Sequence, residues 1–138
     1  MRIKADIYEE MREFFKSSPF FERGCVLGSE NGLITHIYKD EGNRQEGEYV
    51  PDIDRINVVL EEWFEKGVDF VGLAHSHPNG LVLMSKNDEE YMEELKRLNE
   101  LDIIYFPIAS FDRNGNYLIK AYALKEEAIY VEDIEIVP

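Results

Sequence analysis

The chain has 138 residues and a formal net charge of −14, from 15 basic and 29 acidic side chains, and 44% of its residues are hydrophobic. This fits one folded domain, residues 1–138, whose core needs no disulfide or structural metal. The acidic excess repels phosphate backbones and argues against nucleic-acid binding. No apolar run reaches membrane-spanning length, and the first residues lack a secretory signal. We therefore expect a cytoplasmic protein.

The first forty residues predict a helix followed by two strands. Apolar residues recur at helical spacing over residues 4–17. Residues 21–28 and 33–39 are typical of strands, and the Asn31-Gly32 pair between them favours a tight hairpin. The sequence therefore predicts that an amphipathic helix precedes a β-hairpin.

Two side chains on these strands are predicted to be structural. Cys25 is the only cysteine, which excludes an internal disulfide, and its apolar neighbours indicate a small core residue. His36 lies on the second strand, where a lone histidine is more often structural or exposed than a ligand.

A polar segment and a second helix follow. Residues 40–52 contain two glycines, and two interpretations stay open: a solvated connection, or a loop that borders a cleft. Apolar residues from Ile56 to Phe64 then form a helical stripe that ends before Gly67, and Asp54 is a candidate cap.

The second half predicts a buried strand over residues 68–74, a helix that begins at Ser85, and strands over 103–111, 117–124 and 128–137. The order of elements is helix, two strands, helix, strand, helix and three strands. This order predicts an α/β fold in which helices flank a mixed sheet.

The candidate metal ligands follow the buried strand. His75 and His77 are two residues apart, so on an extended chain their imidazoles point the same way. Ser85 and Asp88 read as a helix N-cap and a first-turn carboxylate, which the helix dipole keeps ionised. Two histidines and one aspartate leave a fourth tetrahedral position open for water, as in catalytic zinc sites.

The same residues carry a resemblance to a known family. The pattern His75-x-His77, seven residues, Ser85, two residues, Asp88 resembles the JAMM signature of the MPN+ (JAB) metalloprotease family. The resemblance implies an MPN/JAB-like, cytidine-deaminase-like three-layer fold, with a mixed sheet flanked by helices. The chain lacks a long insertion after Asp88, which favours a compact, prokaryote-like stand-alone member.

The resemblance also implies a glutamate upstream, where it handles the metal-bound water. Glu22 matches this element in its spacing and in the apolar residues that follow it. Glu30 is the competing candidate, but it lies beside the predicted turn. We therefore assign the role to Glu22.

The resemblance implies a role for each residue. One Zn²⁺ with a bound water would be held by His75, His77 and Asp88. Glu22 would act as general base and then general acid, and Ser85 would stabilise the oxyanion. The implied reaction is hydrolysis of a peptide or isopeptide bond after the C-terminal tail of a ubiquitin-like or small β-grasp carrier protein.

Three alternatives remain at this stage. The first is a non-catalytic MPN-type interaction module, and the second is a RadC-like protein of unknown activity. The third is a non-haem iron protein, since two histidines and a carboxylate also suit Fe(II). Ser85 and Asp88 could also be no more than a helix-capping pair.

Overall fold

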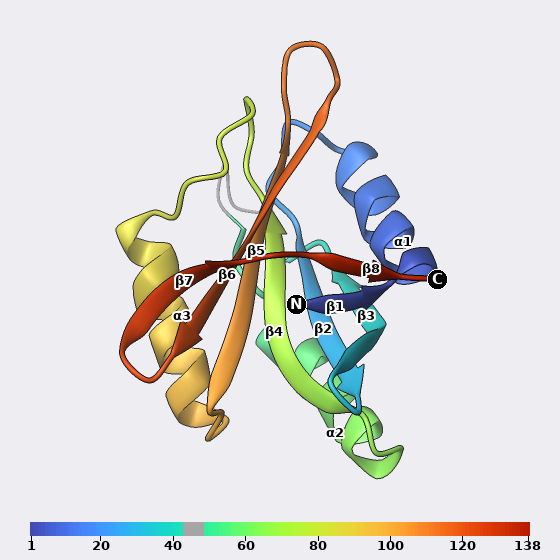
Figure 1. Cartoon of the computed structure of the whole chain (residues 1–138), viewed down its shortest axis with the longest axis vertical. Coiled ribbons are helices and arrows are strands. Elements are labelled where there is room, and N and C mark those ends of the chain that lie inside the picture. The colour runs from blue at the N-terminus through green and yellow to red at the C-terminus, as the bar shows by residue number, and fades with distance from the viewer. Residues whose placement is uncertain (43–48) are drawn as a thin grey trace.

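The computed structural model describes residues 1–42 and 49–138. Within these residues the chain forms eight strands and three helices (Figure 1). In chain order these are β1 (Arg2–Lys4), α1 (Ala5–Lys16), β2 (Gly24–Glu30), β3 (Leu33–Asp40), α2 (Ile53–Glu65), β4 (Asp69–Ser76), α3 (Lys86–Leu98), β5 (Ile103–Phe111), β6 (Tyr117–Lys125), β7 (Ala128–Glu132) and β8 (Glu135–Val137). No helix of the described part is long and apolar enough to cross a membrane.

All eight strands belong to one mixed sheet, in the order β7-β6-β5-β4-β2-β3-β1-β8. Strand β2 lies antiparallel to β3 and β4, and β4 lies parallel to β5. The mixed α/β sheet predicted from the sequence is thereby confirmed. The central position of β4 matters most, because this strand carries His75 and ends one residue before His77.

Helices cover both faces of the sheet, which gives three layers. Helix α1 packs Met11 and Phe15 on one face, against the fully buried Cys25 of β2. Helices α2 and α3 pack on the other face, where Val26 of β2 points. The alternation of side chains along β2 thus supplies both cores, and the core position predicted for Cys25 is confirmed.

The C-terminal strand predicted over 128–137 is wrong, because this segment forms two strands at opposite edges of the sheet. Strand β7 pairs with β6 and β8 pairs with β1, and Figure 1 shows the chain crossing the front of the curled sheet between them. The N-terminal amine donates to the carbonyl of Asp133 at 2.9 Å, and the Glu135 N–H donates to the carbonyl of Met1 at 2.9 Å. Continuous alternation in the sequence conceals such a crossover. Strand β1, which pairs with β8 at this side of the sheet, was not predicted.

The turns and caps agree with the sequence in one case and differ in another. Asn31 and Gly32 both have positive φ, 51° and 80°, as a tight two-residue hairpin requires. Helix α2 is capped by Asp52, whose carboxylate accepts the Arg55 N–H at 3.3 Å, so the prediction of Asp54 is wrong. Asp54 lies inside the first turn because the helix already begins at Ile53.

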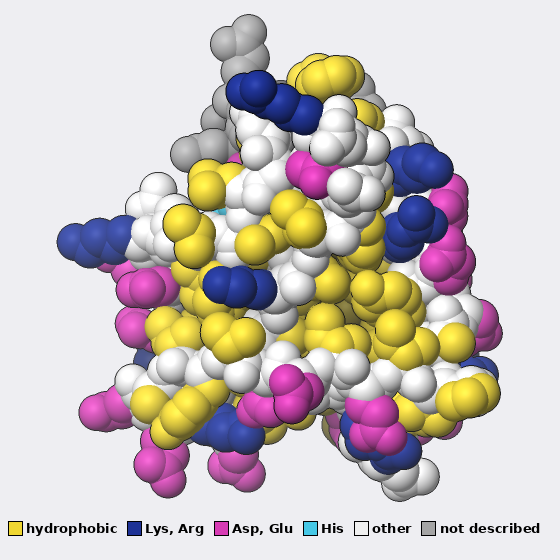
Figure 2. Space-filling view, turned by 45° about the horizontal axis from the view of Figure 1, so that its top comes forward, with side chains coloured by type: hydrophobic (Ala, Val, Ile, Leu, Met, Phe, Trp, Pro, Cys, Tyr) yellow, Lys and Arg dark blue, Asp and Glu magenta, His cyan; other side chains and the backbone are white. Residues whose placement is uncertain are grey.

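Acidic side chains lie towards the margins of the face shown in Figure 2, and hydrophobic side chains gather over its middle.

Part of the segment that the sequence left open as a solvated connection or a cleft border, residues 43–48, lies outside the described residues. Its two ends, at Gly42 and Tyr49, are described.

Candidate metal centre

The carboxyl end of β4 fixes the backbone that carries both histidines. Beyond the last strand residue, the His77 N–H donates to the carbonyl of Ala109 on β5 at 2.8 Å. The Ser110 hydroxyl donates to the His77 carbonyl at 2.6 Å and accepts the Gly80 N–H at 2.8 Å. These bonds hold the chain in place where it turns away from the sheet.

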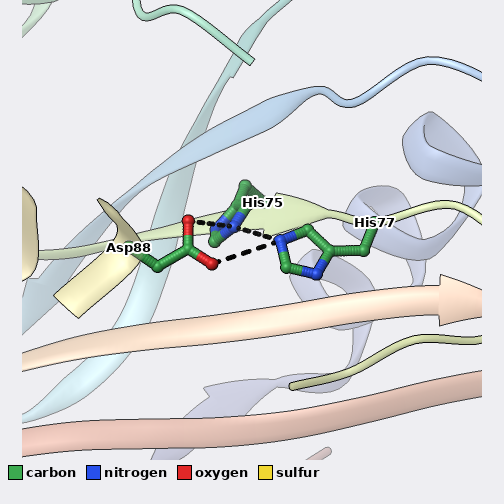
Figure 3. A group of neighbouring side chains, drawn as sticks. All are labelled: His75, His77 and Asp88. Carbon is green, nitrogen blue, oxygen red and sulfur yellow. Dashed lines mark hydrogen bonds and ion pairs between the residues drawn. The ribbon is translucent and has the colours of Figure 1, made fainter. Parts of the chain in front are cut away.

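The side chains of His75, His77 and Asp88 converge (Figure 3). The two Nε2 atoms lie 2.9 Å apart, His75 Nε2 lies 3.2 Å from Asp88 Oδ1, and His77 Nε2 lies 3.4 Å from Asp88 Oδ2. Ligands about 2.0–2.1 Å from a tetrahedral Zn²⁺ are separated from one another by about 3.3 Å. The observed separations of 2.9 to 3.4 Å are close to that value, so the three residues could hold a metal ion of this size.

The charges of the group also suit a cation. Two imidazole nitrogens that face each other at 2.9 Å require a proton or a metal ion between them. Burial alone would raise the pKa of Asp88, but hydrogen bonds from His75 and His77 outweigh it and hold that pKa well below its usual range. Burial lowers the pKa of His77, but the hydrogen bond and charge of Asp88 and the charge of Glu22 together outweigh burial, so the net shift is upward. Asp88 thus stays ionised beside both imidazoles.

Helix α3 positions the carboxylate through its N-terminal cap. The Ser85 hydroxyl accepts the Asp88 N–H at 3.1 Å, and Asp88 Oδ2 accepts the Ser85 N–H at 2.9 Å. This reciprocal capping box was predicted from the sequence and is confirmed. The Asp88 carboxylate therefore caps helix α3 and faces both histidines at the same time.

The ring of His75 is held mainly by packing. It is 3% exposed, and its centroid lies 5.0 Å from that of Phe106. Its Nδ1 has no hydrogen-bond partner among the described residues. Packing against Phe106 therefore supplies the orientation that a hydrogen bond to Nδ1 often gives a metal-bound histidine.

Glu22 approaches the same centre from the segment before β2. Its Oε1 lies 4.0 Å from His77 Nε2, and its Oε2 accepts the Tyr49 N–H at 2.8 Å. The next residue is tied to the loop end of β4: the Arg23 N–H donates to the Ser76 hydroxyl at 3.0 Å, and the Ser76 N–H donates to the Arg23 carbonyl at 2.9 Å. These bonds hold the Glu22 backbone beside the histidine pair.

The competing glutamate lies elsewhere. Glu30 occupies the far end of β2, where it pairs with Leu33 and accepts the Thr35 hydroxyl at 2.9 Å. His36 lies 3.6 Å from Glu30 and its ring contacts Trp63. Neither Glu30 nor His36 belongs to the converging group.

All five residues proposed from the sequence, Glu22, His75, His77, Ser85 and Asp88, line one cleft of about 580 Å³. Tyr49, Val50 and Pro51 of the cleft belong to the segment over residues 40–52, for which bordering a cleft was one of the two open interpretations, and the other residues of the cleft were not predicted. Its remaining walls are largely apolar: Tyr49, Val50, Pro51, Leu73, Leu81, Leu83, Met84, Tyr91 and Phe106. The structure thus brings the predicted residues together, and their roles remain predictions.

No family model matches the sequence, and no curated protein matches it. Solved structures, in contrast, do match this chain. A protein from Desulfitobacterium hafniense is similar with a TM-score of 0.75 and 19% identity, over 99% of this chain and 92% of that one. A JAB1/MPN domain protein from Archaeoglobus fulgidus is similar with a TM-score of 0.61 and 16% identity over the whole of both chains. A structure described as a JAMM metalloprotease-like zinc site in the proteasome and signalosome has a TM-score of 0.60 and 16% identity, over 100% of this chain and 98% of that one.

These comparisons define the fold. At such identities the likeness extends to the arrangement of helices and strands alone, and on that ground the chain has an MPN/JAB-like fold. The fold class predicted from the sequence is therefore confirmed. Within it, His75, His77 and Asp88 form a group that could hold a metal ion.

Proposed function

We propose that the chain is a zinc-dependent peptidase or isopeptidase that acts in the cytoplasm. The observation that carries the proposal is the convergence of His75, His77 and Asp88 on one point, with the Glu22 carboxylate 4.0 Å from His77. Zinc held by the three ligands would lower the pKa of a bound water to about 7 and polarise the scissile carbonyl. The remaining chemistry belongs to side chains of the cleft.

Glu22 acts as the proton carrier in this proposal. Its Oε2 is engaged by the Tyr49 N–H, which leaves Oε1 facing the histidines. That oxygen accepts a proton from the attacking water and later delivers it to the leaving amine. The carboxylate thus serves as general base in the first half of the reaction and as general acid in the second.

Ser85 stabilises negative charge on the carbonyl oxygen of the substrate. Its hydroxyl lines the cleft and accepts the Asp88 N–H. Accepting that bond leaves the hydroxyl proton free to donate to a group bound in the cleft. A donor fixed at a helix N-terminus suits a developing oxyanion.

The proposed substrate is the C-terminal tail of a ubiquitin-like or small β-grasp carrier protein, bound extended through the cleft. The cleft supports this choice because apolar side chains flank the metal group. Leu81 and Leu83 are half exposed on one wall, and the carbonyl of Val82 between them accepts the Tyr122 hydroxyl at 2.8 Å. A wall fixed in this way can take apolar side chains of an extended tail.

The proposal is tested by incubating the zinc-loaded protein with a panel of carrier-protein fusions that end in Gly-Gly or in apolar residues before the scissile bond. We expect wild type to cleave at the end of the tail and Glu22→Gln to retain zinc without cleaving. Tight binding of a carrier with no cleavage by wild type would instead favour an interaction module. Metal analysis that finds iron would contradict the assignment to zinc.

A further inference from the structure

A buried carboxylate, that of Asp40, bonds to Tyr49 of the cleft and joins both described ends of the segment between β3 and α2. Asp40 is 4% exposed. Its Oδ1 accepts the Gly42 N–H at 3.0 Å, and its Oδ2 accepts the Tyr49 hydroxyl at 2.7 Å and the Asp52 N–H at 3.1 Å. Three donors therefore satisfy a carboxylate that would otherwise be costly to bury.

Tyr49 connects this carboxylate to Glu22. Its side chain donates to Asp40, and its backbone N–H donates to Glu22 Oε2 at 2.8 Å. Burial first, and then the hydrogen bond to Asp40, raise the pKa of the Tyr49 phenol, so the hydroxyl stays protonated and remains a donor. One residue thus bonds to both carboxylates.

The strand beneath Tyr49 is shaped for its ring. A Cβ atom added at Gly24 would overlap the tip of the Tyr49 ring. Gly24 is also the residue of β2 that pairs with His75. The ring therefore lies directly against the part of the sheet that carries the metal group.

We infer that Asp40 and Tyr49 are positioning residues for Glu22. Asp40 fixes the Tyr49 side chain, the Tyr49 N–H then occupies Glu22 Oε2, and Oε1 is left directed at the histidines. The kinetic part of this inference rests on the proposed function. If Tyr49 only anchored the chain, the bond from its phenol to Asp40 would be enough. The further bond from its N–H to Glu22 is what points to a positioning role.

Tyr49→Phe tests the inference, because it keeps the ring and the backbone N–H and removes the bond to Asp40. We expect kcat to fall about tenfold, as for other residues that orient a catalytic group, with KM within about twofold of wild type and an unchanged zinc content. Asp40→Asn should act in the same direction. Tyr130→Phe, on the exposed face of β7, is the matched control and should match wild type.

An NMR measurement tests the contact without any turnover. In wild type the amide proton of residue 49 should resonate downfield, because it bonds to a carboxylate. It should move upfield in Glu22→Gln and also in Tyr49→Phe, and stay in place in Tyr130→Phe. A resonance that moves in Glu22→Gln but not in Tyr49→Phe, or in neither, overturns the inference.

The two readouts separate the failure of the inference from that of the proposed function. A wild-type protein that cleaves nothing refutes the proposed reaction, and the amide resonance still decides whether Tyr49 orients Glu22. A wild-type protein that cleaves the panel, with Tyr49→Phe equal to it in kcat, refutes the positioning role alone.

Discussion

Replacing Glu22 by glutamine should separate hydrolysis from metal binding. Glutamine keeps an oxygen that can accept the Tyr49 N–H, now bonded to Glu22 Oε2 at 2.8 Å, but it cannot take up a proton at neutral pH. The three ligand residues are untouched. Loss of a general base costs about 10²–10⁴-fold in rate, or about 3–5 kcal/mol of barrier. We therefore expect kcat to fall by at least about a hundredfold at an unchanged zinc content.

The matched control is Glu30→Gln. Glu30 lies six residues beyond Gly24 along β2, about 20 Å away at 3.3 Å per residue. Steady-state kinetics and metal analysis on both variants are the assay. Equal losses in the two variants, or turnover in Glu22→Gln within tenfold of wild type, would refute the reasoning.

Three further variants or reagents test other parts of the account. Ser85→Ala should lower the free energy of unfolding by about 1 kcal/mol through loss of the cap, and lower kcat about a hundredfold through loss of the oxyanion donor; an unchanged kcat would leave Ser85 with the cap alone. Leu83→Ser should raise KM about tenfold for tails with apolar residues, whereas Leu98→Ser, equally exposed on α3, should not. Burial raises the pKa of the Cys25 thiol, so at pH 8 the native protein should resist thiol reagents and react only on unfolding; rapid labelling of folded protein would contradict its burial.

The metal group was predictable because local rules place each ligand. Alternation along an extended chain puts His75, in β4, and His77, just beyond it, on one side, and the capping box that begins at Ser85 turns Asp88 inward. The assignment of Glu22 rested on a family resemblance, because no local rule fixes the direction of a carboxylate that precedes a strand.

The residues that hold Glu22 were not predictable. The donor from Tyr49 is a backbone N–H, which every residue but proline carries, and it meets Glu22 across 27 positions. In the sequence Asp40 is one of several acidic residues in a polar stretch, and only the fold shows that it is buried. The division of the predicted C-terminal strand into β7 and β8 was missed for a similar reason, because alternation indicates which face a residue occupies and not which edge of the sheet its strand joins.

The central claim is that His75, His77 and Asp88 bind one zinc ion. The most direct test is calorimetric titration of metal-depleted protein with zinc, with metal analysis of the product, on wild type, His77→Ala and Asp88→Ala. We predict one zinc per wild-type chain and no stoichiometric binding by either variant. Stoichiometric zinc in His77→Ala or Asp88→Ala, or none in wild type, would contradict the account.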